Sequence, residues 1–377
     1  MSVPFIDLKS QYKALKSSID SRIQKVLDSG AYINGPEVAE LELKLADHTG
    51  VKNCLAVASG TDALLIPMMA LGIGRGDEVI TTAFSFIATA ETIVLAGAKP
   101  VYIDIDKKTF NIDVKKIEAA ITNKTKAIMP VSLYGQVADL EEINAIAKKH
   151  NLFVIEDTAQ SYGAGYKNKK SGALTHAAGT SFYPAKPLGC YGDGGAIFSN
   201  DDLLYKAMKE IREHGSEKRY YHTRLGVNGR LDTIQCAILL AKLERYDWEV
   251  EQRNKIASGY SEALVGLEKI DPQFSTPYIK TGNKSVWAQY TVTVTNRDSF
   301  QKTMQEHSVP TTVHYPMTMP DQPWYKENTP VQADITHSRW AANHVISLPM
   351  FPDMTEAQMK TVIDAVKKSV ELSMKKG

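Results

Sequence analysis

Residues 152–161, LFVIEDTAQS, place a run of apolar residues directly before two carboxylates, Glu156 and Asp157. Consecutive apolar residues are typical of a strand that is covered on both faces, as in a parallel sheet between helices. The preceding segment, 139–150, repeats its apolar residues at helical spacing. This succession of helix and buried strand predicts an α/β fold.

The same alternation of strand-like and helical segments extends in both directions from this stretch. It predicts a large domain with a mostly parallel seven-stranded sheet between helices. The expected strands are 54–58, 79–82, 100–104, 127–131, 152–156, 180–182 and 196–199.

The pattern changes after about residue 246. A long helical region with interruptions, 203–260, leads to a strand-like segment at 288–295. We therefore expect a large domain over 1–246, N-terminal segment included, and a smaller C-terminal α/β domain over 247–377. The final helix of the smaller domain has one apolar face, formed by Met359, Val362, Ile363, Val366 and Val370.

Composition narrows the class of partner. The 377 residues are 43% hydrophobic and 23% charged, as in soluble globular proteins, and the net charge is +1. A net charge this small produces no electric field that would attract nucleic acid or a membrane surface. We therefore expect the partner to be a small ligand. Cys54, Cys190 and Cys236 lack metal-ligand spacing and indicate reduced thiols in a cytoplasmic protein. His337 and His344 are too sparse to predict a metal site.

Polar segments follow several of the expected strands, where ligands bind in open α/β sheets. The segment 59–62, SGTD, follows strand 54–58 and opens a helix. It is either a phosphate seat, because the first N–H groups of a helix are free, or a simple helix cap. Pro67 removes a backbone donor from this helix and predicts a kink or a tight first turn.

Two further segments complete a candidate site. Asp157 and Gln160 follow strand 152–156, although Asp157 could also only cap the next helix. Lys186 lies between two prolines and precedes a glycine-rich segment, 189–195, whereas a solvated lysine in a turn is the alternative. A lysine can hold an aldehyde cofactor as a Schiff base, and an aspartate can pair with a pyridinium nitrogen. The helix start and Ser181 could then hold a phosphate.

Six segments follow one another along the chain: NGPEV (34–38), SGTDA (59–63), GDEV (76–79), EDTAQ (156–160), SFYPAK (181–186) and GVNGRLD (226–232). In this order they resemble the DegT/DnrJ/EryC1/StrS family of sugar aminotransferases, which are fold-type I enzymes that depend on pyridoxal 5'-phosphate (PLP). The resemblance covers almost the whole chain and implies a homodimer with shared active sites.

The resemblance also implies a role for each candidate residue. Lys186 would bind the cofactor covalently and act as the catalytic acid and base, Asp157 would bind the ring nitrogen, and Gln160 would contact the phenolic oxygen. Phe86 would stack on the ring. The phosphate would be held by Gly60, Thr61, Ser181 and, from the partner subunit, Asn228. His314 and Tyr315 match a segment that contacts substrate.

The glycine-rich segment 181–195 is most similar to one branch of this family. That branch moves an amino group from L-glutamate to the 3-keto group of a UDP-linked 2-acetamido-2-deoxy-hexuluronic acid, for lipopolysaccharide O-antigen synthesis. Such an anionic substrate needs local cations, for which Arg230, Arg219 and His314 are the candidates. Arg230 is the first choice for the carboxylate because guanidinium binds it bidentately, unless it forms an ion pair with Asp232 or another acid.

Other functions remain to be weighed. The main alternative is amination at C4 of a nucleotide-linked 4-keto-6-deoxy sugar, and a more distant one is a non-catalytic regulatory protein with the same fold. Relatives that act as dehydratases carry histidine at the position of Lys186. A nicotinamide-dependent oxidoreductase is disfavoured, because the glycines of 71–76 precede a strand instead of following one.

Overall fold

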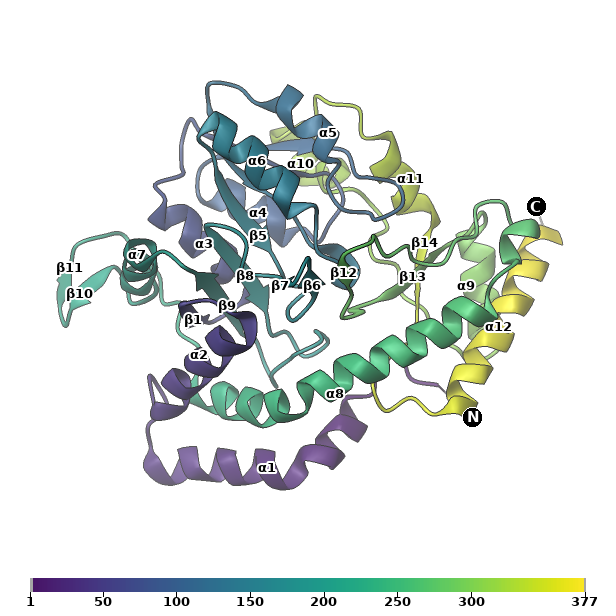
Figure 1. The fold of residues 1–377 in the computed structure, drawn as a ribbon, viewed down its shortest axis with the longest axis horizontal. Helices are drawn as coiled ribbons and strands as arrows, with labels where there is room; N and C mark the ends of the chain where they lie inside the picture. The colour runs from purple at the N-terminus through teal and green to yellow at the C-terminus, as the bar shows by residue number, and fades with distance from the viewer. Residues whose placement is uncertain (1–2, 376–377) are drawn as a thin grey trace.

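A seven-stranded sheet forms the centre of the computed structural model, which describes residues 3–375 (Figure 1). The strand order is β1-β9-β8-β5-β4-β2-β3, and β9 alone runs antiparallel to its neighbours in this sheet. The mostly parallel sheet is therefore confirmed. Its strands are β1 (Asn53–Val57), β2 (Glu78–Thr82), β3 (Lys99–Ile103), β4 (Thr125–Met129), β5 (Phe153–Asp157), β8 (Ala177–Ser181) and β9 (Gly195–Ser199).

All seven predicted strands are present, with ends displaced by up to three residues. The largest displacement is in β8, which begins at Ala177 instead of residue 180. Its first residues, AAG, are small and give no strand signal. Gly179 is needed because a Cβ atom there would lie 2.5 Å from the carbonyl oxygen of Ala63.

Helices cover both faces of the sheet. Successive residues of each strand point to opposite faces, so neighbouring residues pack against different helices. Val154 packs with the cluster under α6, whereas its neighbour Ile155 packs with the cluster under α3 and α4. The helices of this part are α1 (Leu8–Ser29), α2 (Pro36–Thr49), α3 (Gly60–Ala70), α4 (Ala88–Leu95), α5 (Val114–Ile117), α6 (Leu140–His150) and α7 (Asp202–Arg212).

Helix α3 continues through Pro67 without a break, and the expected kink or tight first turn stays a prediction. A proline leaves the carbonyl four residues earlier without its helical hydrogen bond, and here that carbonyl belongs to Ala63. The Ala63 carbonyl faces the backbone of Gly179 on the sheet. This carbonyl therefore lies in the contact between the helix and the sheet.

The long helix α8 (Thr233–Ala263) joins two hydrophobic cores (Figure 1). Its first half, including Leu239 and Tyr246, packs in the core under the sheet, and its second half, including Ile256, packs in a second, smaller core. The predicted division at residue 246 therefore falls inside a helix that belongs to both, and it stays a proposal. Val3 lies in the smaller core, although the N-terminal segment was assigned to the large domain. The other C-terminal elements are β13 (Tyr290–Thr293), α9 (Arg297–Glu306), α10 (Pro323–Asn328), α11 (Thr336–His344), β14 (Val345–Leu348) and α12 (Glu356–Lys375).

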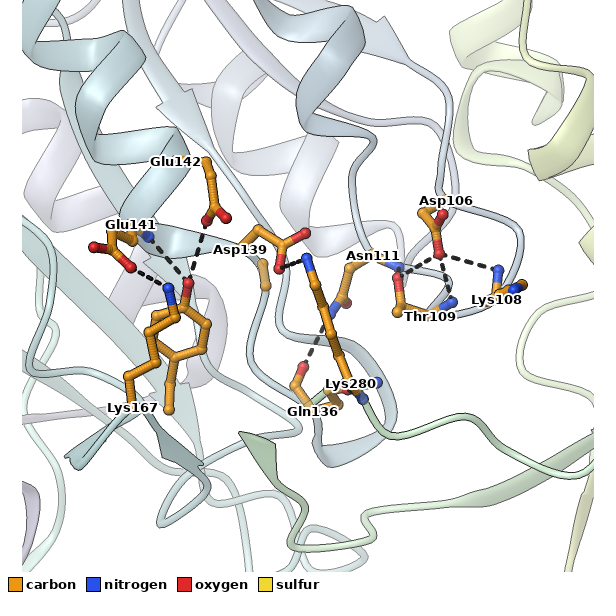
Figure 2. A network of polar contacts seen from close by, with 12 residues as sticks. Asp106, Lys108, Thr109, Asn111, Gln136, Asp139, Glu141, Glu142, Lys167 and Lys280 are labelled. Carbon is orange, nitrogen blue, oxygen red and sulfur yellow. Dashed lines mark hydrogen bonds and ion pairs between the residues drawn. The ribbon is translucent and has the colours of Figure 1, made fainter. Parts of the chain in front are cut away.

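A polar network holds the segment 278–284 against the sheet (Figure 2). The Gln136 amide accepts a hydrogen bond from the Lys280 N–H at 2.6 Å and donates one to the Tyr278 carbonyl at 3.0 Å. The Lys280 ammonium also pairs with Asp139 at 2.7 Å (Figure 2). These contacts fix the C-terminal part beside the turn Leu133–Gly135, which borders the site described below.

A short hairpin of β10 (Ser216–Lys218) and β11 (Tyr221–His222) projects from the sheet next to α7 (Figure 1). It interrupts the predicted helical region 203–260. The three cysteines are buried and free, as predicted. Within residues 3–375, no helix is both long and apolar enough to cross a membrane.

Candidate active site

Three of the predicted polar segments meet at one edge of the sheet. Asp157 ends β5 and Ser181 ends the neighbouring strand β8. Ser59 follows β1 and caps α3 by accepting a hydrogen bond from the Asp62 N–H at 3.0 Å. Because β1, β5 and β8 run in the same direction, their carboxyl ends lie at the same edge.

Lys186 is held in a tight turn just beyond β8. Its N–H donates to the Tyr183 carbonyl at 2.8 Å, and a Cβ atom on Gly189 would lie 2.6 Å from the same oxygen. The buried ammonium of Lys242 bonds the Gly189 carbonyl from beneath. These contacts leave the turn little freedom, and the first glycine of the segment packs against the chain's own backbone.

Burial lowers the pKa of Lys186, and the negative charge of Asp157 partly opposes this effect. The two residues are therefore close enough to interact. A lowered pKa increases the share of neutral amine, which is the form that attacks a carbonyl group.

Asp157 is buried, with 5% of its surface exposed. It accepts hydrogen bonds from the Thr89 hydroxyl at 2.8 Å and the Ala159 N–H at 3.1 Å. Burial raises the pKa of Asp157. No cationic side chain among residues 3–375 forms an ion pair with it, so a ligand that brings its own N–H⁺ group would be stabilised there.

Gln160 is fixed from two sides. Its side-chain oxygen accepts from the Tyr134 N–H at 2.8 Å, and its side-chain nitrogen donates to the Tyr315 hydroxyl at 3.0 Å. An amide nitrogen carries two hydrogens, so one donor remains for a ligand. Neither Tyr134 nor Thr89 could be found from the sequence, because a tyrosine after a strand and a threonine in an apolar helix carry no site signal.

The start of α3 has the two properties of an anion seat. Its first N–H groups lie at the positive end of the helix dipole, where an anion is stabilised. A Cβ atom on Gly60 would lie 2.6 Å from the Ser181 Cβ, so only glycine allows this approach. Ser59 provides the helix cap, and the two alternatives from the sequence are therefore compatible.

Aromatic side chains line the adjoining space. Phe86 is 53% exposed, and its ring lies 6.0 Å from that of Tyr315. An apolar ring exposed beside buried polar groups offers a face for a planar ligand.

His314 lies near Lys186 but is not a cation. Burial, and then the positive charge of Lys186, lower its pKa to about 4. Its Nδ1 atom lies 2.9 Å from the Ser347 hydroxyl. Without a substrate, His314 therefore adds no positive charge at neutral pH, and its contact with the substrate stays a prediction.

The other predicted cations, Arg230 and Arg219, interact with other side chains. Arg230 forms an ion pair with Glu213 at 3.1 Å, which is the alternative left open from the sequence. Arg219 lies on the hairpin, with its guanidinium 5.0 Å from the centre of the Tyr220 ring. Asn228 is exposed. Within residues 3–375, the side chains of Arg230, Arg219 and Asn228 form no bond to Lys186 or Asp157.

The site suits PLP in each part that the chain itself supplies. Lys186 can bind an aldehyde, Asp157 forms no ion pair within the described residues, and Gln160 has one N–H that could donate to a ligand. The start of α3 against Ser181 can receive a phosphate. We find no part of the set that conflicts with this cofactor.

The chain was compared with protein families, characterised proteins and solved structures. The model of the DegT/DnrJ/EryC1/StrS aminotransferase family matches residues 13–367. A UDP-2-acetamido-2-deoxy-3-oxo-D-glucuronate aminotransferase from Pseudomonas aeruginosa is 53% identical, over 97% of this chain and 99% of its own. A pleiotropic regulatory protein from Geobacillus stearothermophilus is 45% identical, over 97% and 98% of the two chains. The solved structure of DesV from S. venezuelae superposes with a TM-score of 0.95 at 36% identity, over 98% and 99%.

Proposed function

Because the chain belongs to the DegT/DnrJ/EryC1/StrS aminotransferase family, we propose that it is a PLP-dependent aminotransferase acting on a UDP-linked 3-keto sugar. The amino donor is L-glutamate, and the acceptor is the 3-keto group of a 2-acetamido-2-deoxy-hexuluronic acid. The observation that supports this choice of substrate is the 53% identity, over nearly the full length, to an enzyme named for that substrate. The product would serve lipopolysaccharide O-antigen synthesis in the cytoplasm.

The proposed cofactor would be held by the residues described above. Lys186 would bind it covalently, Asp157 would bind the ring nitrogen, and Phe86 would cover the ring. Gly60, Thr61 and Ser181 would bind the phosphate. PLP supplies an electron-withdrawing ring that stabilises negative charge on the carbon next to the amino group.

The chain's own groups then perform the proton transfers. The Lys186 amine, with its lowered pKa, can accept a proton from the donor's α-carbon and return it elsewhere, as an acid–base catalyst requires. The negative charge of buried Asp157 would favour a protonated ring nitrogen on the bound cofactor. The hydrogen bond from Gln160 to Tyr315 fixes the orientation of the Gln160 amide beside these groups. One site that serves both substrates in turn predicts ping-pong kinetics.

We also propose a homodimer in which Asn228 and Arg230 serve the partner's site. Asn228 is exposed, and among the residues that the structure describes it forms no bond with the site of its own chain. The hairpin and the segment after it present large apolar side chains, with Tyr220 82% and Leu225 84% exposed. Such exposed apolar surface is typical of a subunit interface. In the dimer, Arg230 would exchange Glu213 for the substrate carboxylate.

The regulatory alternative is favoured by one relative, which is named as a pleiotropic regulatory protein. In this chain, however, Lys186 and Asp157 lie together at the sheet edge with their pKa values shifted by burial. A protein that only bound a ligand would not need a nucleophilic amine there, so catalysis is the better account.

The substrate is tested by supplying the PLP-loaded protein with L-glutamate and then with single keto sugars. We expect the UDP-linked 3-keto hexuluronic acid to be aminated at C3. Faster amination of a nucleotide-linked 4-keto-6-deoxy sugar would favour the alternative substrate. Purified protein that bound PLP and aminated no keto sugar would support the regulatory account.

A further inference from the structure

Tyr315 connects the C-terminal part of the chain to a predicted cofactor ligand. It follows His314 in a segment remote in sequence from β5, yet its hydroxyl accepts the hydrogen bond from Gln160 at 3.0 Å. Its ring packs 6.2 Å from that of Phe84 and 6.0 Å from that of Phe86. Neither the phosphate seat nor the covalent attachment at Lys186 needs this residue.

We propose that Tyr315 is a positioning residue, whose hydroxyl holds the Gln160 amide so that its second N–H points to the phenolic oxygen of the bound cofactor. The proposal rests on the proposed function, because it needs the cofactor. It goes further by giving a residue outside the sheet control over the cofactor's protonation.

The orientation of Gln160 follows from its partners. The Tyr134 backbone N–H is a donor only, so the group that faces it must be the amide oxygen. The amide nitrogen then faces the other way, where Tyr315 accepts one of its two hydrogens. With the oxygen and one hydrogen held, the direction of the second hydrogen is determined.

Tyr315 is itself held firmly. The hydroxyl of Tyr134 donates to the carbonyl of His314, which precedes Tyr315, and the His314 ring contacts Ser347 on β14. Burial, and then the charge of Asp157, raise the pKa of Tyr315, so its hydroxyl stays neutral and can accept the bond. The position of the C-terminal part therefore sets the direction of the Gln160 donor.

A donor that points to the phenolic oxygen stabilises the negative charge on that oxygen. Loss of the Tyr315 hydroxyl leaves Gln160 held by one bond instead of two and weakens this donation. The pH midpoint of the visible absorbance change of the PLP-loaded protein should therefore rise, by roughly 0.5 to 1 unit for one weakened hydrogen bond.

The experiment is an absorbance titration with pH of four PLP-loaded proteins: wild type, Tyr315→Phe, Gln160→Ala and the double variant. We expect Tyr315→Phe to raise the midpoint in the wild-type background and to change it little in the Gln160→Ala background, because the effect passes through Gln160. Tyr102→Phe is the matched control. It removes another buried tyrosine hydroxyl, bonded to Thr329, and should leave the midpoint unchanged.

The outcomes separate this proposal from the proposed function. A wild type with no visible band after PLP is added would refute the proposed function itself. A normal wild-type titration with no shift in Tyr315→Phe would overturn the role of Tyr315. A shift of equal size in the Gln160→Ala background would overturn it too, since Tyr315 would then act directly. If Tyr315→Phe does not fold, Tyr315→Leu removes the same hydroxyl and must give the same direction of shift.

Discussion

Replacing Gly60 with alanine tests the phosphate seat in isolation. The added Cβ would lie 2.6 Å from the Ser181 Cβ and 3.0 Å from its hydroxyl oxygen. Both distances are too short, so the start of α3 and Ser181 must move apart. The unliganded chain can relax in this way, but a phosphate bound between the two needs them together.

The expected cost is that of overpacking, about 1 to 3 kcal/mol. At about 1.4 kcal/mol per tenfold change, PLP should bind roughly 5- to 150-fold more weakly. The assay is a titration of the cofactor-free protein with PLP, followed by visible absorbance. Gly74→Ala is the matched control, because a Cβ there meets its nearest atom, the Ala96 carbonyl, at 3.4 Å. Equal PLP affinity in Gly60→Ala and wild type would refute the placement of the phosphate.

Three further predictions follow from the same structure. Asp157→Asn should lower kcat by roughly 10²- to 10³-fold, because the negative charge beside the cofactor's ring nitrogen is lost. Steady-state kinetics that showed less than a tenfold change in kcat would refute this. Arg230→Leu should lower kcat/KM for a uronic-acid sugar by about 10- to 100-fold more than for a sugar without the carboxylate; an equal loss for both would leave Arg230 as the structural partner of Glu213. The pKa of Lys242 is lowered by burial from 10.5 to about 8, so folding favours its neutral form and stability due to this group rises as the pH increases from about 8 toward 10.5. Denaturant unfolding should therefore show wild type gaining up to about 3 kcal/mol relative to Lys242→Met over that range, and parallel pH profiles would contradict this.

The sequence predicted the sheet well because its strands carry strong local signals. Apolar runs that end in polar residues mark β1 and β5, and all seven strands were found. The start of β8 was missed because its residues are small and carry no strand signal. A small residue is required at Gly179 because helix α3 packs directly across it. The hairpin β10–β11 was missed because its strands are only two or three residues long and are exposed on both faces, so no periodic pattern marks it.

The candidate site was predictable where one residue type performs one chemistry. Lys186, Asp157 and Gln160 were proposed as site residues; in the structure Lys186 lies near Asp157, and Gln160 bonds to Tyr315. The state of each group was not predictable, since it depends on burial and on partners remote in the chain. His314 is neutral because it is buried near Lys186, and Arg230 is paired because the chain folds Glu213 beside it.

The central claim is that Lys186 carries PLP and that the protein takes its amino group from L-glutamate. The most direct test is the visible spectrum of the PLP-loaded protein before and after L-glutamate, with no sugar present, in wild type and Lys186→Ala. The account predicts that the visible band of the wild type disappears while 2-oxoglutarate and pyridoxamine phosphate form in equal amounts, and that Lys186→Ala forms neither at a comparable rate. A wild-type band that is unchanged by L-glutamate, or full conversion by Lys186→Ala, would contradict it.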